Sequence, residues 1–532
     1  EVEDQVLHHP AVEEAQKVLD NKNIMLQKSV LFLFLFFSLY INSQTLQEIL
    51  NISLDKPNGT ARFESMGGAF GALGGDLSAI NVNPASSSVF NDNEYILTLG
   101  TAKKSNKSLF FNNSKKANNN KFSVNQAGGV WLLKNFGGGN INKISFGINA
   151  QTNNSFNNSF EIVGRNKSNS IDKFFLNNSL GFNSSDLSVG NNESIAGVYK
   201  YLGENFGYSA QQAFLAYQAY LINYDKDSNS FYSLANYSEG VDQQYISETK
   251  GVNTKYNINF AVQFKENYYF GLNINTHEIY INNYIKHQES NFASNSAITG
   301  IIFENNLVTQ GEGLSIQLGG IAKFNSFRLG VSYQSPTWYN LWDETYQYLE
   351  TQSIDKDGVK YQDKIDPRVI NSYPEYKLTT PSSITTSAAI IFGKLGLLSL
   401  DIINRDYSKI KAKPNRDFLN TNKKIENQLT NTIDIRLGTE IKIERLSLRA
   451  GYGKMGSPYA GSIGVNNPSK IIDDSKLYSF GIGYDFGETL ISFSYKMLES
   501  NKYHQLFDSG LTDFAKIDSN NSASTLSVVF KF

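Results

Sequence analysis

The sequence predicts an all-β protein: a transmembrane antiparallel β-barrel of about 14 strands, with an N-terminal segment inside its lumen and a partly helical extracellular loop. Three observations support this. An apolar run near the N-terminus indicates export, apolar and polar residues alternate with period two along most of the later chain, and every second join between these segments is short. Because every backbone polar group in hydrocarbon needs an internal partner, such strands cross a bilayer only as a closed barrel.

The export signal begins at Met25, where a lysine precedes the apolar run "SVLFLFLFFSLYI". A run of about 13 residues is shorter than the roughly 18 to 20 of a membrane-spanning helix, so we interpret 25–43 as a signal peptide cleaved near Ser43 or Gln44. A buried core helix is the alternative. Residues 1–24 are charged and helix-prone, and we expect them to be upstream or added sequence.

Composition excludes several classes of function. The chain of 532 residues contains no cysteine, which excludes disulfides, thiolate metal sites and a cysteine nucleophile. Without 1–43 it carries 45 basic and 44 acidic residues, a formal charge of +1 that argues against nucleic acid as a partner. His277, His287 and His504 lack zinc-site spacing, so we expect no metal and no cofactor. None of these histidine positions suggests a nucleophile–base pair either, so we expect no enzymatic activity.

The alternating segments divide the exported chain into strands. In 433–443, isoleucine, leucine and threonine occupy one face while Asp434, Arg436, Glu440 and Lys442 occupy the other. We expect the apolar faces to meet lipid and the ionic faces to line the lumen. The predicted strands are 94–112, 122–135, 142–160, 252–265, 268–285, 306–324, 326–340, 378–393, 396–412, 430–444, 446–456, 476–487, 489–503 and 523–532.

The joins alternate in length, and the predicted barrel spans 94–532. Outer-membrane barrels have short periplasmic turns and longer extracellular loops, and their strand number is even. The chain ends in "STLSVVFKF", which resembles the terminal strand read by the barrel assembly machinery. The short joins are "GGGN" at 137–140, "KEN" at 265–267, "NS" at 325–326, "GKLG" at 393–396, "ER" at 444–445 and "GE" at 487–488.

One join, at about 161–250, is much longer than the others. Phe214, Leu215, Tyr217, Tyr220 and Leu221 recur in it at helical spacing. We predict a helical cap on the barrel rim. An apolar landing site for a ligand is the alternative interpretation of the same surface.

The stretch "RFESMGGAFGALGGDLSAINVNPAS" at 62–86 places five glycines in nine positions. A phosphate-binding loop is excluded, because no two of these glycines have the required spacing and no lysine follows. The stretch lies within 44–93, before the first strand. A barrel of about 14 strands leaves an aqueous channel unless something fills it, so we expect 44–93 to lie in the lumen.

The chain resembles the FadL/TodX outer-membrane transporters of long-chain fatty acids and other hydrophobic compounds. The resemblance is carried by the stretch "ARFESMGGAFGALGGDLSAINVNPAS", which precedes the predicted barrel. The specific part is Met66–Phe70 with Asn83-Pro84-Ala85; Ser86 stands where we expect a glycine. The resemblance implies an N-terminal hatch, a kinked strand that opens the wall, and lateral exit of ligand into the membrane. The implied hatch or gate residues are Met66, Gly67, Gly68, Phe70, Gly71, Gly74, Gly75, Asn83 and Pro84.

The expected function is passive uptake of hydrophobic small molecules, such as long-chain fatty acids, across the cell outer membrane. Candidate contacts for a ligand carboxylate are Arg328, Arg436, Lys442 and Arg449, although ion pairs with lumen carboxylates are an alternative role for them. The expected partners are the ligand, the lipid bilayer, the assembly machinery and possible outer-membrane proteins. Two alternatives stay open: a haem-related uptake protein, and a non-transporting barrel subunit of a secretion or assembly complex.

Overall fold

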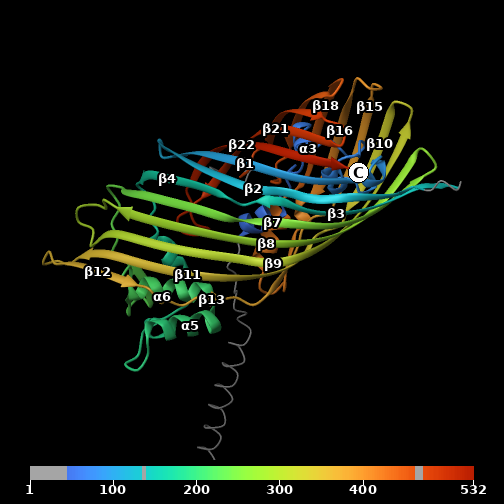
Figure 1. Ribbon diagram of the computed structural model, residues 1–532. Helices are drawn as coiled ribbons and strands as arrows, with labels where there is room; N and C mark the ends of the chain where they lie inside the picture. Colours follow the sequence, from blue (N-terminus) through green and yellow to red (C-terminus); the bar gives the residue numbers. More distant parts are fainter. Residues whose placement is uncertain (1–44, 135–138, 462–470) are drawn as a thin grey trace, which may run out of the picture.

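Fourteen antiparallel strands close into a barrel, when interrupted strands are counted once (Figure 1). The computed structural model describes residues 45–134, 139–461 and 471–532. β1 (Glu94–Phe110) closes the barrel, because it pairs antiparallel with both β2 (Asn113–Lys134) and β22 (Phe514–Lys531). The predicted fold class is confirmed.

The remaining wall strands follow in chain order. They are β3 (Ile141–Ser155) with β4 (Asn158–Asn166), β7 (Val241–Phe264), β8 (Tyr268–Ser290), β9 (Ile298–Phe324), β10 (Phe327–Gln334) with β11 (Trp338–Ile354), β14 (Tyr376–Thr379) with β15 (Ser383–Ile391), β16 (Gly396–Asp406), β18 (Asn431–Ile443), β19 (Leu446–Met455), β20 (Ser475–Asp485) and β21 (Thr489–Gln505). Short strands beside this wall are β12 (Lys360–Ile365), β13 (Asn371–Ser372) and β17 (Lys411–Lys413).

The two faces of the wall strands differ as the period-two pattern predicts. On β18, Ile433 and Ile441 are about half exposed on the outside, whereas Asp434, Arg436 and Glu440 are buried inside. Apolar side chains therefore cover the outer face, and ionic side chains face the lumen.

Aromatic side chains cluster at the short-turn end of the barrel. Tyr95 packs edge-on against both Trp131 and the C-terminal Phe532, with ring centroids 5.5 Å and 5.0 Å away. Aromatic rings at this level are typical of the boundary between hydrocarbon and lipid head groups. The C-terminal phenylalanine is thus part of the wall.

The short joins are confirmed wherever the structure describes them. Lys265, Asn325, Gly393, Glu444 and Gly487 adopt the positive φ of tight turns. One prediction about the other end is wrong: β1 and β2 meet in a tight turn at 111–112, and 113–121, expected to be a loop, is strand. Its Asn- and Lys-rich sequence has low strand propensity, but pairing with β1 overrides that preference.

Three predicted strands are interrupted. The segment 142–160 breaks at 156–157 between β3 and β4, 326–340 breaks at 335–337 between β10 and β11, and 378–393 breaks at 380–382 between β14 and β15. Pro336 and Pro381 account for the last two breaks, because proline donates no ladder hydrogen bond. The first break contains no proline.

The segment before β1 occupies the lumen, where it is drawn in dark blue in Figure 1. It consists of α2 (Leu46–Ser53), α3 (Ala61–Ser65) and the 3₁₀ helices η1 (Leu77–Asn81) and η2 (Pro84–Val89). Thr45, Thr60, Asp76 and Asn83 cap these four helices through their side chains. We call 59–90 the hatch.

The long join folds as a largely helical cap at the end of the barrel opposite the hatch (Figure 1). It contains α4 (Asp172–Asn178), η3 (Ser184–Leu187), α5 (Ile195–Phe206), α6 (Tyr208–Gln218) and the hairpin of β5 (Ile222–Asp225) and β6 (Ser230–Ser233). Phe214 and Leu215 are fully buried in its core. Another outer loop carries η4 (Tyr407–Lys409) and α7 (Leu419–Gln428).

The predicted upstream segment 1–24 and signal peptide 25–43 lie outside the described residues, as do 137–138 of the first predicted turn. Within the described ranges, no helix has both the length and the apolarity to span a membrane.

Candidate functional site

The hatch glycines serve two different purposes. Gly67, Gly68, Gly74 and Gly75 have φ between +62° and +76°, a conformation that other residues adopt only with strain. Gly71 does not, but a Cβ there would lie 2.0 Å from Ser387 Oγ on the wall. The glycine run therefore combines left-handed turns with one very close approach to the barrel.

Wall glycines complement the hatch. A Cβ on Gly330 would lie 2.2 Å from the Gly71 carbonyl oxygen, and one on Gly451 would lie 2.2 Å from the Gly67 nitrogen. At Gly438, a Cβ would lie 2.5 Å from the Met66 carbonyl oxygen. Hatch backbone and wall backbone pack directly on each other at these positions, so side chains leave no space between them.

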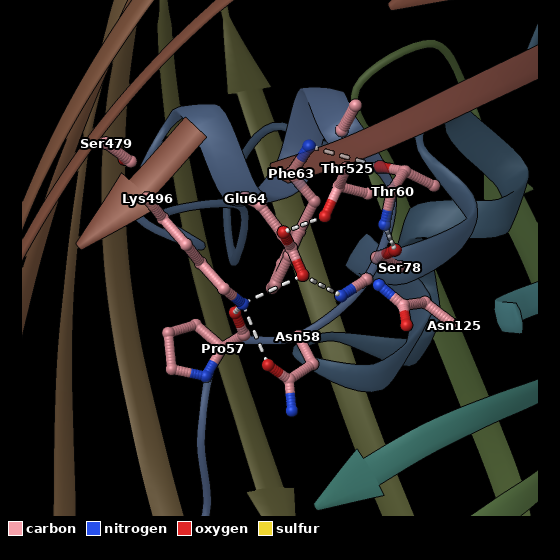
Figure 2. Close-up of polar contacts among 12 residues, drawn as sticks. Pro57, Asn58, Thr60, Phe63, Glu64, Ser78, Asn125, Ser479, Lys496 and Thr525 are labelled. Atoms are coloured by element: carbon pink, nitrogen blue, oxygen red, sulfur yellow. Dashed lines mark hydrogen bonds and ion pairs between the residues drawn. The ribbon is translucent and has the colours of Figure 1, made fainter. Parts of the chain in front are cut away.

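Glu64 connects the hatch to the last two wall strands, β21 and β22 (Figure 2). Its carboxylate pairs with Lys496 on β21 at 2.8 Å and accepts hydrogen bonds from Thr525 Oγ1 on β22 at 2.7 Å and from the Gly59 amide at 3.1 Å. Glu64 is 1% exposed. A carboxylate this deeply buried needs these partners, since an unpaired charge would be costly to bury.

Asp401 on β16 is a second anchor. Its carboxylate accepts hydrogen bonds from the amides of Phe70 at 2.9 Å and Gly71 at 3.0 Å. A third anchor joins Arg62 of the hatch to Glu440 at 3.0 Å, and Glu440 to Arg449 at 2.6 Å. The hatch is thus fixed by charged wall side chains on three strands around the lumen: Asp401 on β16, Glu440 on β18 and Lys496 on β21.

Asn83 and Pro84 form the other end of the hatch. Asn83 Oδ1 accepts from the Ala85 amide and caps η2, and its Nδ2 donates to the carbonyls of Gly71 at 2.7 Å and Gly320 at 3.0 Å. Pro84 begins η2, where its missing N–H costs nothing. Met66 and Phe70 are fully buried in the apolar cluster of the hatch.

The four candidate cations occupy different surroundings. Arg449 is committed to Glu440, and Arg328 donates to the Leu73 carbonyl of the hatch. Lys442 is exposed near the short-turn end. Arg436 is the one of the four that lines either of the two cavities between the hatch and the cap; it is 4% exposed, and its Nε has no hydrogen-bond partner.

Two cavities lie between the hatch and the cap. We call the one beside the hatch the lower cavity and the one beside the cap the upper cavity. The lower one, of about 110 Å³, is lined by 52–58, the hatch, and wall residues that include Arg405 and Arg436. The upper cavity, of about 1000 Å³, lies between α2 and the cap. Aromatic side chains contribute much of its apolar lining: Phe160, Phe174, Tyr245, Phe303 and Phe507.

The third wall strand opens a seam beside the upper cavity. The β2–β3 ladder stops at the pair Gln126–Gln151, although β2 continues to pair with β1 as far as Asn113. Beyond the break at 156–157, β4 pairs with β7, and Asn106 of β1 donates to Asn158 at 2.8 Å. We define the seam as the stretch of wall between β2 and the interrupted strand β3–β4. It runs from the pair Gln126–Gln151 to the pair Asn106–Asn158. Among the described strands, β2 pairs with β1 along the seam and with no strand on its other edge.

Residues at the break face the upper cavity. Asn154, Ser155 and Phe156 line it. Phe156 is 9% exposed and belongs to the same buried cluster as Ile49 and Leu50 of α2. The sequence had predicted one unbroken strand here; the asparagine-rich "QTNNSFNNSF" at 151–160 was the available signal, because asparagine is depleted in strands.

Fold and site together define a closed outer-membrane-type barrel with a hatch, a cavity and an interrupted third strand. No family model and no curated protein matches the chain in sequence. Among solved structures, a FadL homologue from Pseudomonas aeruginosa aligns at 11% identity and a TM-score of 0.51, covering 90% of this chain and 100% of that one. A TodX monoaromatic hydrocarbon channel mutant aligns at 13% identity and a TM-score of 0.50, covering 90% and 100%. The resemblance to FadL/TodX barrels is confirmed at the level of the fold.

Proposed function

We propose that the protein is an outer-membrane channel for passive uptake of hydrophobic small molecules, with long-chain fatty acids as one candidate class, in the manner of the FadL/TodX transporters. Ligand enters below the cap, collects in the upper cavity and leaves sideways through the seam into the bilayer. No catalytic step is needed. The observation that carries this proposal is the break in the third wall strand beside a large, partly aromatic cavity.

Energetics favour a lateral route over an axial one. An apolar molecule gains about 0.8 kcal/mol per CH₂ on moving from water into an apolar pocket or the bilayer, so an aqueous exit into the periplasm offers it no gain. The seam, in contrast, joins an apolar cavity to hydrocarbon.

The hatch contacts support the same route. Moving the hatch away would separate Glu64 from Lys496 and Arg62 from Glu440. Breaking one buried ion pair costs about 3–5 kcal/mol when a partner is left uncompensated. The hatch residues Met66–Gly75 and Asn83-Pro84 therefore act, in this proposal, as a fixed seal below the exit.

Other residues take local roles in the proposal. Phe156 and α2 form a gate at the break, because they share one apolar cluster beside the seam. Arg436 is the candidate contact for a carboxylate that reaches the lower cavity, since it is the one predicted cation that faces it. The signal peptide at 25–43 and assembly by the barrel machinery belong to the same proposal.

A reversible cross-link tests the lateral exit. The chain contains no cysteine, so Asn106→Cys/Asn158→Cys, bridged by a short cleavable thiol reagent, ties β1 to β4 and limits opening of the seam. In cells lacking the native protein, we expect bridging to reduce uptake of a labelled long-chain fatty acid at least fivefold and cleavage to restore it. The matched control is Thr101→Cys/Ser524→Cys, which bridges neighbours on the continuous β1–β22 ladder and should leave uptake unchanged.

The outcomes separate the parts of the proposal. Uptake that is equal with and without the protein contradicts transport itself. Uptake that depends on the protein but ignores the β1–β4 bridge contradicts the seam as the exit.

A further inference from the structure

Four lysines line the upper cavity: Lys424 on α7, and three on separate elements that lie near one another. Lys56 follows α2, Lys104 lies on β1 and Lys502 lies on β21, and all three line the cavity. Lys104 is close enough to be repelled by both others, and Lys502 is repelled by Lys56. Within the described residues, no carboxylate lies at ion-pair distance from any of the three ammonium groups.

Three of the five described carboxylates that line the cavity have other partners. Asp55 and Asp434 both pair with Arg405, at 3.3 Å and 3.9 Å. Glu48 accepts from the Thr45 amide in the capping box of α2. Within the described residues, the other two carboxylates, Asp473 and Asp508, also lie beyond ion-pair distance from the three lysines, so these ammonium groups have no carboxylate partner.

His504 adds an unpartnered polar group at the same place. It lies two residues after Lys502 on β21, so both side chains point to the same face. It lines the cavity, and both of its buried ring nitrogens lack a hydrogen-bond partner. Polar atoms buried in this way usually have a partner, so the site has unused hydrogen-bonding capacity.

The apolar lining begins immediately beside these cations. Lys502 Nζ lies 4.7 Å from the ring centroid of Phe160, and Phe160 packs against His504 and Tyr245. Phe303 and Phe507 extend the aromatic surface. The cavity thus has a cationic end and an aromatic wall, which matches an anionic amphiphile.

We infer that the upper cavity binds an amphiphile whose head group carries more than one negative charge, of the phosphate-monoester class. Three like charges in one cavity repel each other, and a bound anion relieves that repulsion. A carboxylate would compensate one of them, whereas a phosphate monoester carries about −1.5 to −2 near pH 7 and offers three acceptor oxygens. Lysine binds an anion as a point charge, so three ammonium groups select for total charge more than for the shape of the head group.

This inference rests on the proposed uptake function and names the ligand class of its cavity. The test compares dodecyl phosphate, dodecanoate and dodecanol, which share one alkyl chain, by calorimetric titration of the full protein in nanodiscs. We expect dodecyl phosphate to bind at least tenfold tighter than the other two, with an affinity that falls as salt rises. Lys56→Gln/Lys104→Gln/Lys502→Gln should weaken dodecyl phosphate at least tenfold and leave dodecanol within twofold.

The matched control is Lys103→Gln/Lys107→Gln, which removes exposed outward-facing lysines from the same strand as Lys104. This variant should keep the preference for phosphate. If dodecanol binds the native protein as tightly as dodecyl phosphate, or the triple variant binds dodecyl phosphate normally, the inference is wrong while the proposed function stands. If none of the three binds, both are wrong. Inorganic phosphate binding as tightly as dodecyl phosphate would contradict an amphiphile as the ligand.

Discussion

At the scale of single residues, Gly71 makes the tightest fit between hatch and wall. Its amide donates to Asp401, and its carbonyl oxygen accepts from Asn83 Nδ2 at 2.7 Å. The space for a side chain is taken by Ser387. Gly75 is different: its φ is +65°, but no atom lies within 4 Å of the position that a Cβ would occupy. Substitutions at these two glycines therefore distinguish steric exclusion from backbone strain.

We expect Gly71→Ala to destabilise the hatch by about 1–3 kcal/mol, because overpacking forces the hatch backbone off the wall. Ion leak in planar bilayers should rise as the seal loosens. Gly75→Ala is the control, and it should cost about 1 kcal/mol of backbone strain without a rise in leak. Thermal unfolding and bilayer conductance measure the two effects. Equal leak in both variants would contradict a steric role for Gly71.

At the scale of elements, α4 of the cap contains a buried carboxyl group outside the wall strands. Asp172 is 2% exposed, and its Oδ1 has no hydrogen-bond partner. Burial raises the pKa of Asp172 to about 6, and the neighbouring Glu289 adds to the shift. A raised carboxyl pKa means that the docked helix binds the proton more tightly than the undocked one. Docking is therefore strongest when Asp172 is protonated, and it weakens as pH rises through about 6.

The expected result is stronger amide protection of α4 at pH 5 than at pH 8, by about 1–1.5 kcal/mol in opening free energy. Hydrogen exchange corrected for intrinsic rates measures it. Asp172→Asn should remove most of this difference, while Asp227→Asn in the exposed β5–β6 turn should keep it. Protection of α4 that increases with pH would contradict the assignment.

At the scale of the whole molecule, the proposed function divides two tasks between the hatch and the seam. Charged anchors on β16, β18 and β21 hold the hatch in the lumen, and in this proposal the hatch closes the axial path. The seam lies next to the upper cavity, where Phe156 shares an apolar cluster with α2. The proposal therefore assigns sealing against ions and release of an apolar ligand to separate parts of the barrel.

Deletion of 66–75 tests this division. We expect ion conductance to rise severalfold, because the deletion removes the backbone that packs on Gly438 and Gly451. Uptake of a labelled fatty acid should persist, since the seam is left in place. Liposome-based conductance and uptake assays on the same preparation measure both. Loss of uptake with unchanged conductance would contradict the separation.

The particular residues show why some features were predictable. Alternation over 433–443 reports directly which side chains meet lipid, because a strand has only two faces. Turn positions such as 444–445 were also predictable, because a join of two residues allows few backbone conformations. The break at 156–157 was not, because it depends on β4 reaching Asn106 of β1, which lies far away in sequence. The tight turn at 111–112 was missed because pairing with β1 imposes strand structure on a polar segment.

The amino-acid sequence alone determined the closed barrel, its short turns and the presence of an N-terminal segment that must fill the lumen, because backbone hydrogen bonding in hydrocarbon allows few alternatives. Only the tertiary structure decided how that segment is held and where the wall opens. Arg449 became a partner of Glu440, which also pairs with Arg62 of the hatch, while Lys56, Lys104 and Lys502 came together around one cavity. Such groupings arise from strands distant in sequence, whose neighbours around the lumen are set by closure of the whole barrel.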